Sequence, residues 1–161
     1  MRQLTPVEAA VLLSVASCAL AVAVPAFVRN VHASRLVEPM DGLQRIAGRA
    51  QALAAGRPNE LGYPADAPLT PATVPRGELV VDPPGTWDHP TWRELGFSIS
   101  DPHAFSFAFD ESREGEVKSF VAKAHGDLDG DGSLSTFSIA GKLQRGGEPV
   151  TLPLEIHREV E

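Results

Sequence analysis

The residues of this chain best suited to chemistry lie in one short loop, in which acidic side chains alternate with other residues. The candidate metal ligands are Asp127, Asp129, Asp131 and Ser133. Alternating carboxylates can direct hard oxygen ligands toward one centre, and Gly132 permits the sharp turn that lets the Ser133 carbonyl join them. At the twelfth position, where an EF-hand has a bidentate Glu, this loop has Ser138. The spacing predicts a calcium site, and the alternative is an Asp/Gly-rich turn without an ion.

The histidines, in contrast, show no spacing that is typical of metal ligands or of a catalytic pair. They are His32, His89, His103, His125 and His157. The chain also lacks a nucleophile elbow, a phosphate-binding loop and a dinucleotide-binding fingerprint. A catalytic base needs an oriented partner, and scattered histidines are more often exposed or structural. The sequence therefore predicts that this protein is not an enzyme.

Glu8 is the second chemically unusual residue, because it stands at the start of an apolar run over residues 9–28. The run has three interruptions, namely Ser14, Ser17 and Pro25. It is long enough to cross a bilayer, where a charged side chain near the middle costs about 2.5–3.5 kcal/mol. An acid in such a segment is a candidate functional residue. Pro25 follows Glu8 by 17 positions.

The apolar run is followed by an amphipathic pattern and then by a proline-rich segment. Apolar residues recur every three or four positions, which predicts that the helix continues over residues 29–56; they are Leu36, Met40, Leu43, Ala47, Ala50 and Ala54. Residues 57–92 hold eight of the 14 prolines and are predicted to form a long connecting loop. Four apolar residues at its end predict a short helical turn that anchors the loop on the core, namely Trp87, Trp92, Leu95 and Phe97.

Alternating apolar and polar residues near the C-terminus predict four strands, over residues 104–109, 117–124, 135–143 and 149–157. The expected fold class is therefore α+β, with a long N-terminal helix packed on a four-stranded antiparallel sheet. The expected segments are a possible short leader (1–3), a transmembrane helix (4–28), its amphipathic continuation (29–56), the proline-rich loop with its aromatic anchor (57–97) and the β-sheet region with the Asp-rich loop (98–161).

Charge and cysteine content narrow the function further. Residues 1–56 hold five Lys/Arg and three Asp/Glu, whereas residues 57–161 hold nine and eighteen, for a net charge of −7 in all. The outer part is thus acidic, and no basic aromatic pattern suggests contact with nucleic acid. The single cysteine, Cys18, excludes an intrachain disulfide. The stretch Val15-Ala16-Ser17-Cys18 also fits the lipobox of a lipoprotein, an alternative disfavoured by the apolar residues that follow it.

The N-terminal segment resembles that of type IV pilins and type II secretion pseudopilins. The resemblance lies in the Thr5-x-x-Glu8 start, the apolar helix and the stretch Val24-Pro25-Ala26-Phe27. It implies a pilin-like fold, cleavage by a prepilin peptidase after Gln3 and methylation of Leu4, although the family has Gly at the position of Gln3. It also implies that Glu8, fifth from the new terminus, pairs with the amino terminus of a neighbouring subunit. Pseudopilins carry calcium loops in the same C-terminal region.

The resemblance predicts a structural subunit of a pilus or secretion filament, held in the inner membrane before assembly, with other pilin subunits as its partners. Its C-terminal domain would be periplasmic or lie on a cell-surface filament. The positive-inside rule argues for the reverse orientation, because Arg29 and Arg35 follow the apolar run. The alternative function is a single-pass, membrane-tethered periplasmic binding protein that does not form filaments.

Overall fold

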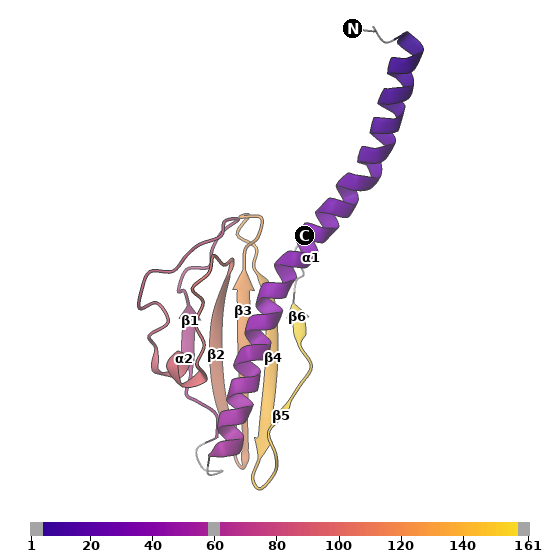
Figure 1. The fold of residues 1–161 in the computed structure, drawn as a ribbon. Coiled ribbons are helices and arrows are strands. Elements are labelled where there is room, and N and C mark those ends of the chain that lie inside the picture. Colours follow the sequence, from indigo (N-terminus) through magenta and orange to yellow (C-terminus); the bar gives the residue numbers. More distant parts are fainter. Residues whose placement is uncertain (1–4, 58–61, 158–161) are drawn as a thin grey trace. The chain divides into compact units, whose positions relative to one another are not determined.

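The computed structural model describes residues 5–57 and 62–157 of the chain. Its elements are, in order, α1 (Pro6–Gly56), β1 (Ala67–Thr70), α2 (Pro90–Leu95), β2 (Phe105–Glu114), β3 (Val117–Gly126), β4 (Ser135–Gln144), β5 (Val150–Thr151) and β6 (Glu155–His157) (Figure 1). The chain divides into two compact units, Met1–Val37 and Glu38–Glu161, and α1 contributes residues to both. The protein is α+β, with an apolar N-terminal helix and an antiparallel sheet.

Helix α1 begins where the sequence provides a helix start. Thr5 precedes the first helical residue, Pro6, whose missing N–H is not needed at this position and whose backbone angle suits a helix. The helix then runs to Gly56, and neither Pro25 nor Pro39 interrupts it. The chain therefore stays helical past both prolines, each of which removes a backbone donor inside the helix.

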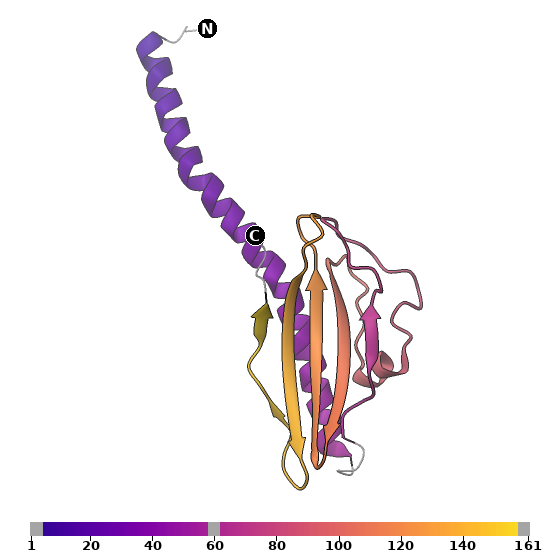
Figure 2. The same cartoon turned by 180° about the vertical axis from the view of Figure 1, so that it is seen from behind.

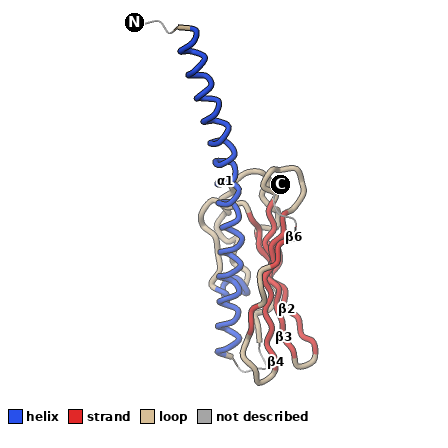
Figure 3. Tube along the Cα trace, turned by 90° about the vertical axis from the view of Figure 1, so that its right-hand side faces the viewer, coloured by secondary structure: helices blue, strands red, loops and turns tan. Residues whose placement is uncertain are grey.

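In the second unit, α1 from Glu38 onward lies against one face of the sheet, as the side view shows (Figure 3). Its inward side chains are fully or almost fully buried, namely Leu43, Ile46, Ala47, Ala50 and Ala54. Ile46 is absent from the stripe that the sequence predicts, whereas Met40, which is part of that stripe, is 37% exposed. The buried face runs through Pro39, Gly42 and Ile46, so the predicted stripe is displaced around the helix at its N-terminal end.

The sheet has six strands rather than the four expected from the sequence. Strands β1 to β5 follow one another in order across the sheet, β6 also pairs with β4, and all pairs are antiparallel. The first three predicted strands correspond to β2, β3 and β4. The fourth is divided into β5 and β6 by a segment that contains Pro153, and β1 comes from the proline-rich segment. Figure 2 shows the sheet from the side away from α1.

Pairs of large and small residues opposite each other build the inner face of the sheet. Phe105 lies opposite Gly126, and Phe107 lies opposite Ala124. Gly42 of α1 allows close approach of the helix, since a Cβ there would lie 2.6 Å from the ring of Phe107. Bulky rings therefore fill the space that the small residues leave, which produces an aromatic layer between helix and sheet.

The aromatic residues at the end of the proline-rich segment join this layer. Trp92, Leu95 and Phe97 are at most 3% exposed, and the rings of Trp87 and Phe97 meet edge to face at 5.4 Å. The Nε–H of Arg49 in α1 donates a hydrogen bond of 3.2 Å to the carbonyl of Leu95, at the end of α2. Helix α2 is thus fixed beside the C-terminal part of α1.

Candidate functional site

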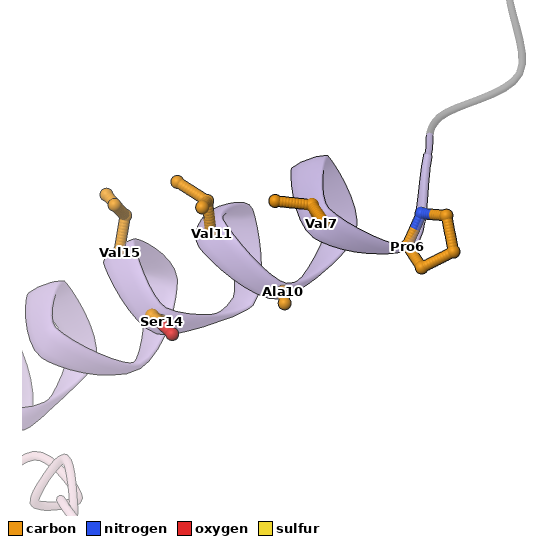
Figure 4. Close-up of a pocket in the computed structure, with 6 residues that line it drawn as sticks. All are labelled: Pro6, Val7, Ala10, Val11, Ser14 and Val15. Atoms are coloured by element: carbon orange, nitrogen blue, oxygen red, sulfur yellow. The ribbon is translucent and has the colours of Figure 1, made fainter.

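The first candidate region is the apolar segment Pro6–Val24 of α1, which is long and apolar enough to cross a membrane. Its mean hydropathy is 2.3, and none of it is buried against other parts of the described chain. Six residues from its first turns form a shallow apolar surface, namely Pro6, Val7, Ala10, Val11, Ser14 and Val15 (Figure 4). Because all six lie on one helix, this is a helix face and not an enclosed cavity. A cleavable signal sequence would meet the same criteria of length and hydropathy.

Glu8 and Thr5 form a reciprocal capping box at the start of this segment. Glu8 Oε2 accepts the backbone N–H of Thr5 at 2.9 Å and the Thr5 hydroxyl at 2.8 Å. The backbone N–H of Glu8 in turn donates to Thr5 Oγ1 at 3.3 Å. These contacts satisfy backbone donors that a helix start leaves without partners. Glu8 therefore has a local structural role, which the sequence prediction did not include.

For the other residues predicted for processing and assembly, the structure describes no side-chain contacts. Gln3 and Leu4 lie outside the described residues. Pro25 belongs to α1, and its side chain also lies outside the described part.

The second candidate region is the loop between β3 and β4, which brings the three predicted aspartates together. Asp127, Asp129 and Asp131 each place one carboxylate oxygen within 4.8 Å of an oxygen of the other two. Gly130 and Gly132 have positive φ angles of 79° and 94°, so both adopt the left-handed turn conformation that favours glycine. Three acidic oxygens on one tight turn are a donor set that suits a calcium ion.

The same carboxylates also hold the turn through its backbone. The buried Asp127 accepts the N–H groups of Gly130 and Gly132, at 2.9 and 3.1 Å. Asp131 Oδ1 accepts the N–H of Ser133 at 2.6 Å, and this bond lowers the pKa of the exposed Asp131 carboxyl. The turn is therefore organised by side chain–backbone hydrogen bonds, as the alternative interpretation of the sequence expects.

The proline-rich segment contacts this loop directly. The N–H of Gly77 donates to the Asp127 carbonyl at 2.7 Å, and Arg76 Nε lies 4.0 Å from Asp127 Oδ2. The exposed Arg76 thus compensates part of the negative charge of the loop. Glu148, which could be considered as a further ligand, follows the opposite end of β4 and is not part of this cluster.

A polar cluster in the second unit was not predicted from the sequence. Glu38 of α1 accepts backbone N–H groups at the start of β2, and His103 lies beside them with Asp82 as its partner. The indole N–H of Trp87 donates to the same Asp82 oxygen at 2.8 Å. These residues come from α1, from the loop before α2 and from the segment before β2, so no local motif could have indicated the cluster.

Comparison of the chain with protein-family models, with curated proteins and with solved structures finds no match. The resemblance to pilins thus rests on the residues of the N-terminal segment and of the Asp-rich loop.

Proposed function

We propose that this chain is a pilin-like structural subunit of a type IV pilus or of a type II secretion-type filament. The observation that supports this most is one uninterrupted helix that serves two environments. Its residues Pro6–Val24 are apolar apart from Glu8 near the start and the two serines Ser14 and Ser17, and its residues from Glu38 onward cover an antiparallel sheet. A subunit that is stored in a membrane and later assembled needs such a division of one helix.

In this proposal the apolar half of α1 holds the subunit in the inner membrane, with the second unit on the periplasmic side. After cleavage behind Gln3, the helix packs with those of other subunits. Glu8 then pairs with the amino terminus of a neighbouring subunit, which offsets the cost of a carboxylate in apolar surroundings. The capping box and the intermolecular pair are successive roles of one carboxylate.

The two roles of Glu8 are separable by substitution. Glu8→Gln keeps a side-chain oxygen for the capping box but removes the charge, whereas Thr5→Ala weakens the box and keeps the charge. We expect the Gln variant to insert into the membrane but to be lost from sheared surface filaments. We expect the Thr5→Ala variant to assemble. Normal assembly of Glu8→Gln together with failure of Thr5→Ala would show that Glu8 is only a helix cap.

Intact-mass measurement of the native protein tests processing independently. A chain that begins at Leu4 and carries one added methyl group supports the pilin-like function. An unprocessed Met1 terminus without filaments would instead support the alternative, a membrane-tethered periplasmic binding protein. A lipid on Cys18 would exclude both in favour of a lipoprotein.

The calcium site is the second part of the proposal. The three aspartate oxygens within 4.8 Å support it, and the ion would hold the turn between β3 and β4. Since the chain has one cysteine, no intrachain disulfide can provide that stabilisation. The ion's role would be structural, because its binding to the folded state adds to the stability of that state.

A further inference from the structure

His103 is buried between two hydrogen-bond acceptors. Its side chain is 1% exposed. Ring atom Nδ1 lies 2.9 Å from the carbonyl oxygen of Phe105, and Nε2 lies 3.0 Å from Asp82 Oδ2. A carbonyl oxygen only accepts hydrogen bonds, so this contact is a hydrogen bond only when Nδ1 carries a proton.

The second contact needs a proton as well. An ionised carboxylate also only accepts, and a neutral imidazole has a single N–H, which Nδ1 already uses. Both contacts are hydrogen bonds at once only when a further proton lies between Nε2 and Oδ2, either on His103 as an imidazolium or on Asp82. In that doubly bonded state the pair holds one proton more than a neutral histidine beside an ionised aspartate.

The surroundings of His103 favour that proton. Two acids act on the ring, namely Asp82 from the loop before α2, whose Oδ2 lies 3.0 Å from Nε2, and Glu38 from α1. Both are acids, so a positive ring is stabilised by each of them. The ring also occupies a structural junction, because Val80 pairs with the backbone of His103 in both directions and Trp87 donates to Asp82.

We propose that His103 is a proton-dependent latch, which fastens the segment from Val80 to Trp87 onto the start of β2. When one of the two protons is lost, a single ring N–H remains for two acceptors, so a ring lone pair faces either the Phe105 carbonyl or the Asp82 carboxylate. The contact then becomes repulsive, and the segment opens more often. The latch is closed when the extra proton is bound and loosens when that proton is lost.

The test uses the full chain in detergent micelles and compares two buried indoles. Trp87 donates to Asp82 within the latch, whereas the Trp92 indole donates to Thr70 Oγ1 at 2.9 Å. We expect the hydrogen-exchange rate of the Trp87 indole, divided by that of Trp92, to rise with pH by up to about tenfold per pH unit, which is the limiting slope when one proton leaves on opening. The ratio cancels the pH dependence that is common to both indoles. A ratio that stays constant from about pH 5 to 8 would overturn the proposal.

Nitrogen NMR of the histidine rings provides a second readout on the unaltered protein. At the acid end of the range, we expect the signals of Nδ1 and Nε2 of His103 to show a bound proton on Nδ1 and a shared or bound proton on Nε2. An Nε2 that stays without a proton throughout the range, beside an ionised Asp82, would contradict the latch.

Substitutions distinguish the contribution of His103 from that of His125, the other histidine among the described residues whose ring makes a side-chain contact. His103→Gln should remove the rise of the Trp87 to Trp92 exchange ratio with pH. His125→Gln is the matched control, since His125 lies on β3 and its Nδ1 meets Thr136 Oγ1 at 2.9 Å, far from Asp82 along the chain. That variant should keep the rise in full. If the exchange ratio depended on pH in the same way in both variants, the assignment to His103 would be overturned. If His103→Gln does not fold, the NMR measurement on the unaltered protein tests the proposal instead.

Discussion

Glu38 and Phe105, which are 67 residues apart in the chain, are joined by a hydrogen bond of 3.0 Å from the backbone N–H of Phe105 to Glu38 Oε1. The N–H of Ala104 also donates to this carboxylate, at 3.1 and 3.2 Å from its two oxygens. Both donors are buried, and both precede or begin β2. The first residue of the second unit is thus tied to the start of the sheet by one side chain.

Replacing Glu38 tests how much these two hydrogen bonds contribute. Glu38→Ala leaves two buried N–H groups without an acceptor, and one such group costs about 1–3 kcal/mol. We expect the free energy of unfolding of the full chain to fall by about that amount or more. Glu38→Gln keeps an oxygen that can accept both N–H groups, so it should cost less. Chemical denaturation of the three proteins in the same detergent measures the difference, and equal losses for Ala and Gln would contradict this role.

The charge of Glu38 predicts a pH dependence of stability. Burial raises the pKa of Glu38 above its ordinary value of 4.5, although the backbone N–H groups of Ala104 and Phe105 act in the opposite direction. The folded state therefore holds this proton more tightly than the unfolded state. Its contribution to stability is complete below pH 4.5 and is lost as the pH rises through the raised pKa. Glu38→Gln should lack this loss, so its stability relative to the unaltered protein should increase over that window. If the difference in stability between Glu38→Gln and the unaltered protein did not change with pH, the linkage to Glu38 would be refuted.

Two glycines in the second unit predict opposite effects of the same substitution. A Cβ on Gly141 would lie within 3.0 Å of three ring atoms of Phe120, whereas a Cβ on the helical Gly48 would meet no atom within 4 Å. Gly141→Ala should therefore destabilise the fold by about 1–3 kcal/mol through overpacking. Gly48→Ala should stabilise it by about 0.5–1 kcal/mol, because alanine loses less entropy in a helix.

Thermal unfolding measures both glycine variants in the full chain. The double variant Gly141→Ala/Phe120→Leu is the control, since the smaller side chain makes room for the added methyl group. It should be less destabilised than the sum of its single changes. A Gly141→Ala protein as stable as the unaltered chain would mean that the sheet relaxes around the ring at little cost.

Elements with a strong local pattern could be predicted from the sequence. The apolar run identifies the start of α1, and the alternation at Phe105 and Phe107 identifies β2. Strand β1 could not be predicted, because Pro68 argues against a central strand and only its position at the edge of the sheet makes it acceptable. The last strand was predicted as one, although Pro153 divides it.

The candidate sites divide in the same way. Asp127, Asp129 and Asp131 are close in sequence, so their spacing was enough to place them on one turn. The pair of His103 and Asp82 lies 21 residues apart, and Glu38 lies 66 residues from Ala104. Such contacts depend on tertiary packing of loops against a helix, and residue spacing carries no signal for them.

The chain's one tyrosine, Tyr63, allows a test of a buried hydroxyl. Its side-chain oxygen is buried without a hydrogen-bond partner among the described residues, and burial raises the pKa of Tyr63 to about 12. Tyr63→Phe keeps the edge-to-face ring contact with Phe120 at 4.7 Å. We expect the variant to be more stable by about 1 kcal/mol, since an unpaired polar group no longer has to be buried.

The alkaline behaviour of Tyr63 provides the accompanying measurement. Phenolate absorbance reports this residue alone, and it should appear near pH 12 in the folded protein rather than near its ordinary value of 10. Because the folded pKa is raised, the stability linked to this proton is complete below pH 10 and is lost between the two values. Titration near pH 10 in the folded state would mean that the hydroxyl is solvated.

The last prediction concerns the Asp-rich loop. If calcium binds at Asp127, Asp129 and Asp131, the full chain in detergent should unfold at a higher temperature in millimolar calcium than in chelator. The gain is about 2.7 kcal/mol when the ion is in hundredfold excess over its dissociation constant. Magnesium should stabilise less, because it requires a smaller and more regular shell of ligands.

Asp129→Asn is the matched control, because its side-chain oxygen can still accept the Asp131 N–H, a bond of 3.1 Å, while the charge is lost. That variant should lose the calcium effect and keep the turn. Arg76→Gln should strengthen the effect, since the guanidinium group 4.0 Å from Asp127 opposes a cation. Equal unfolding temperatures in calcium and in chelator would show that the hydrogen-bonded turn is complete without an ion.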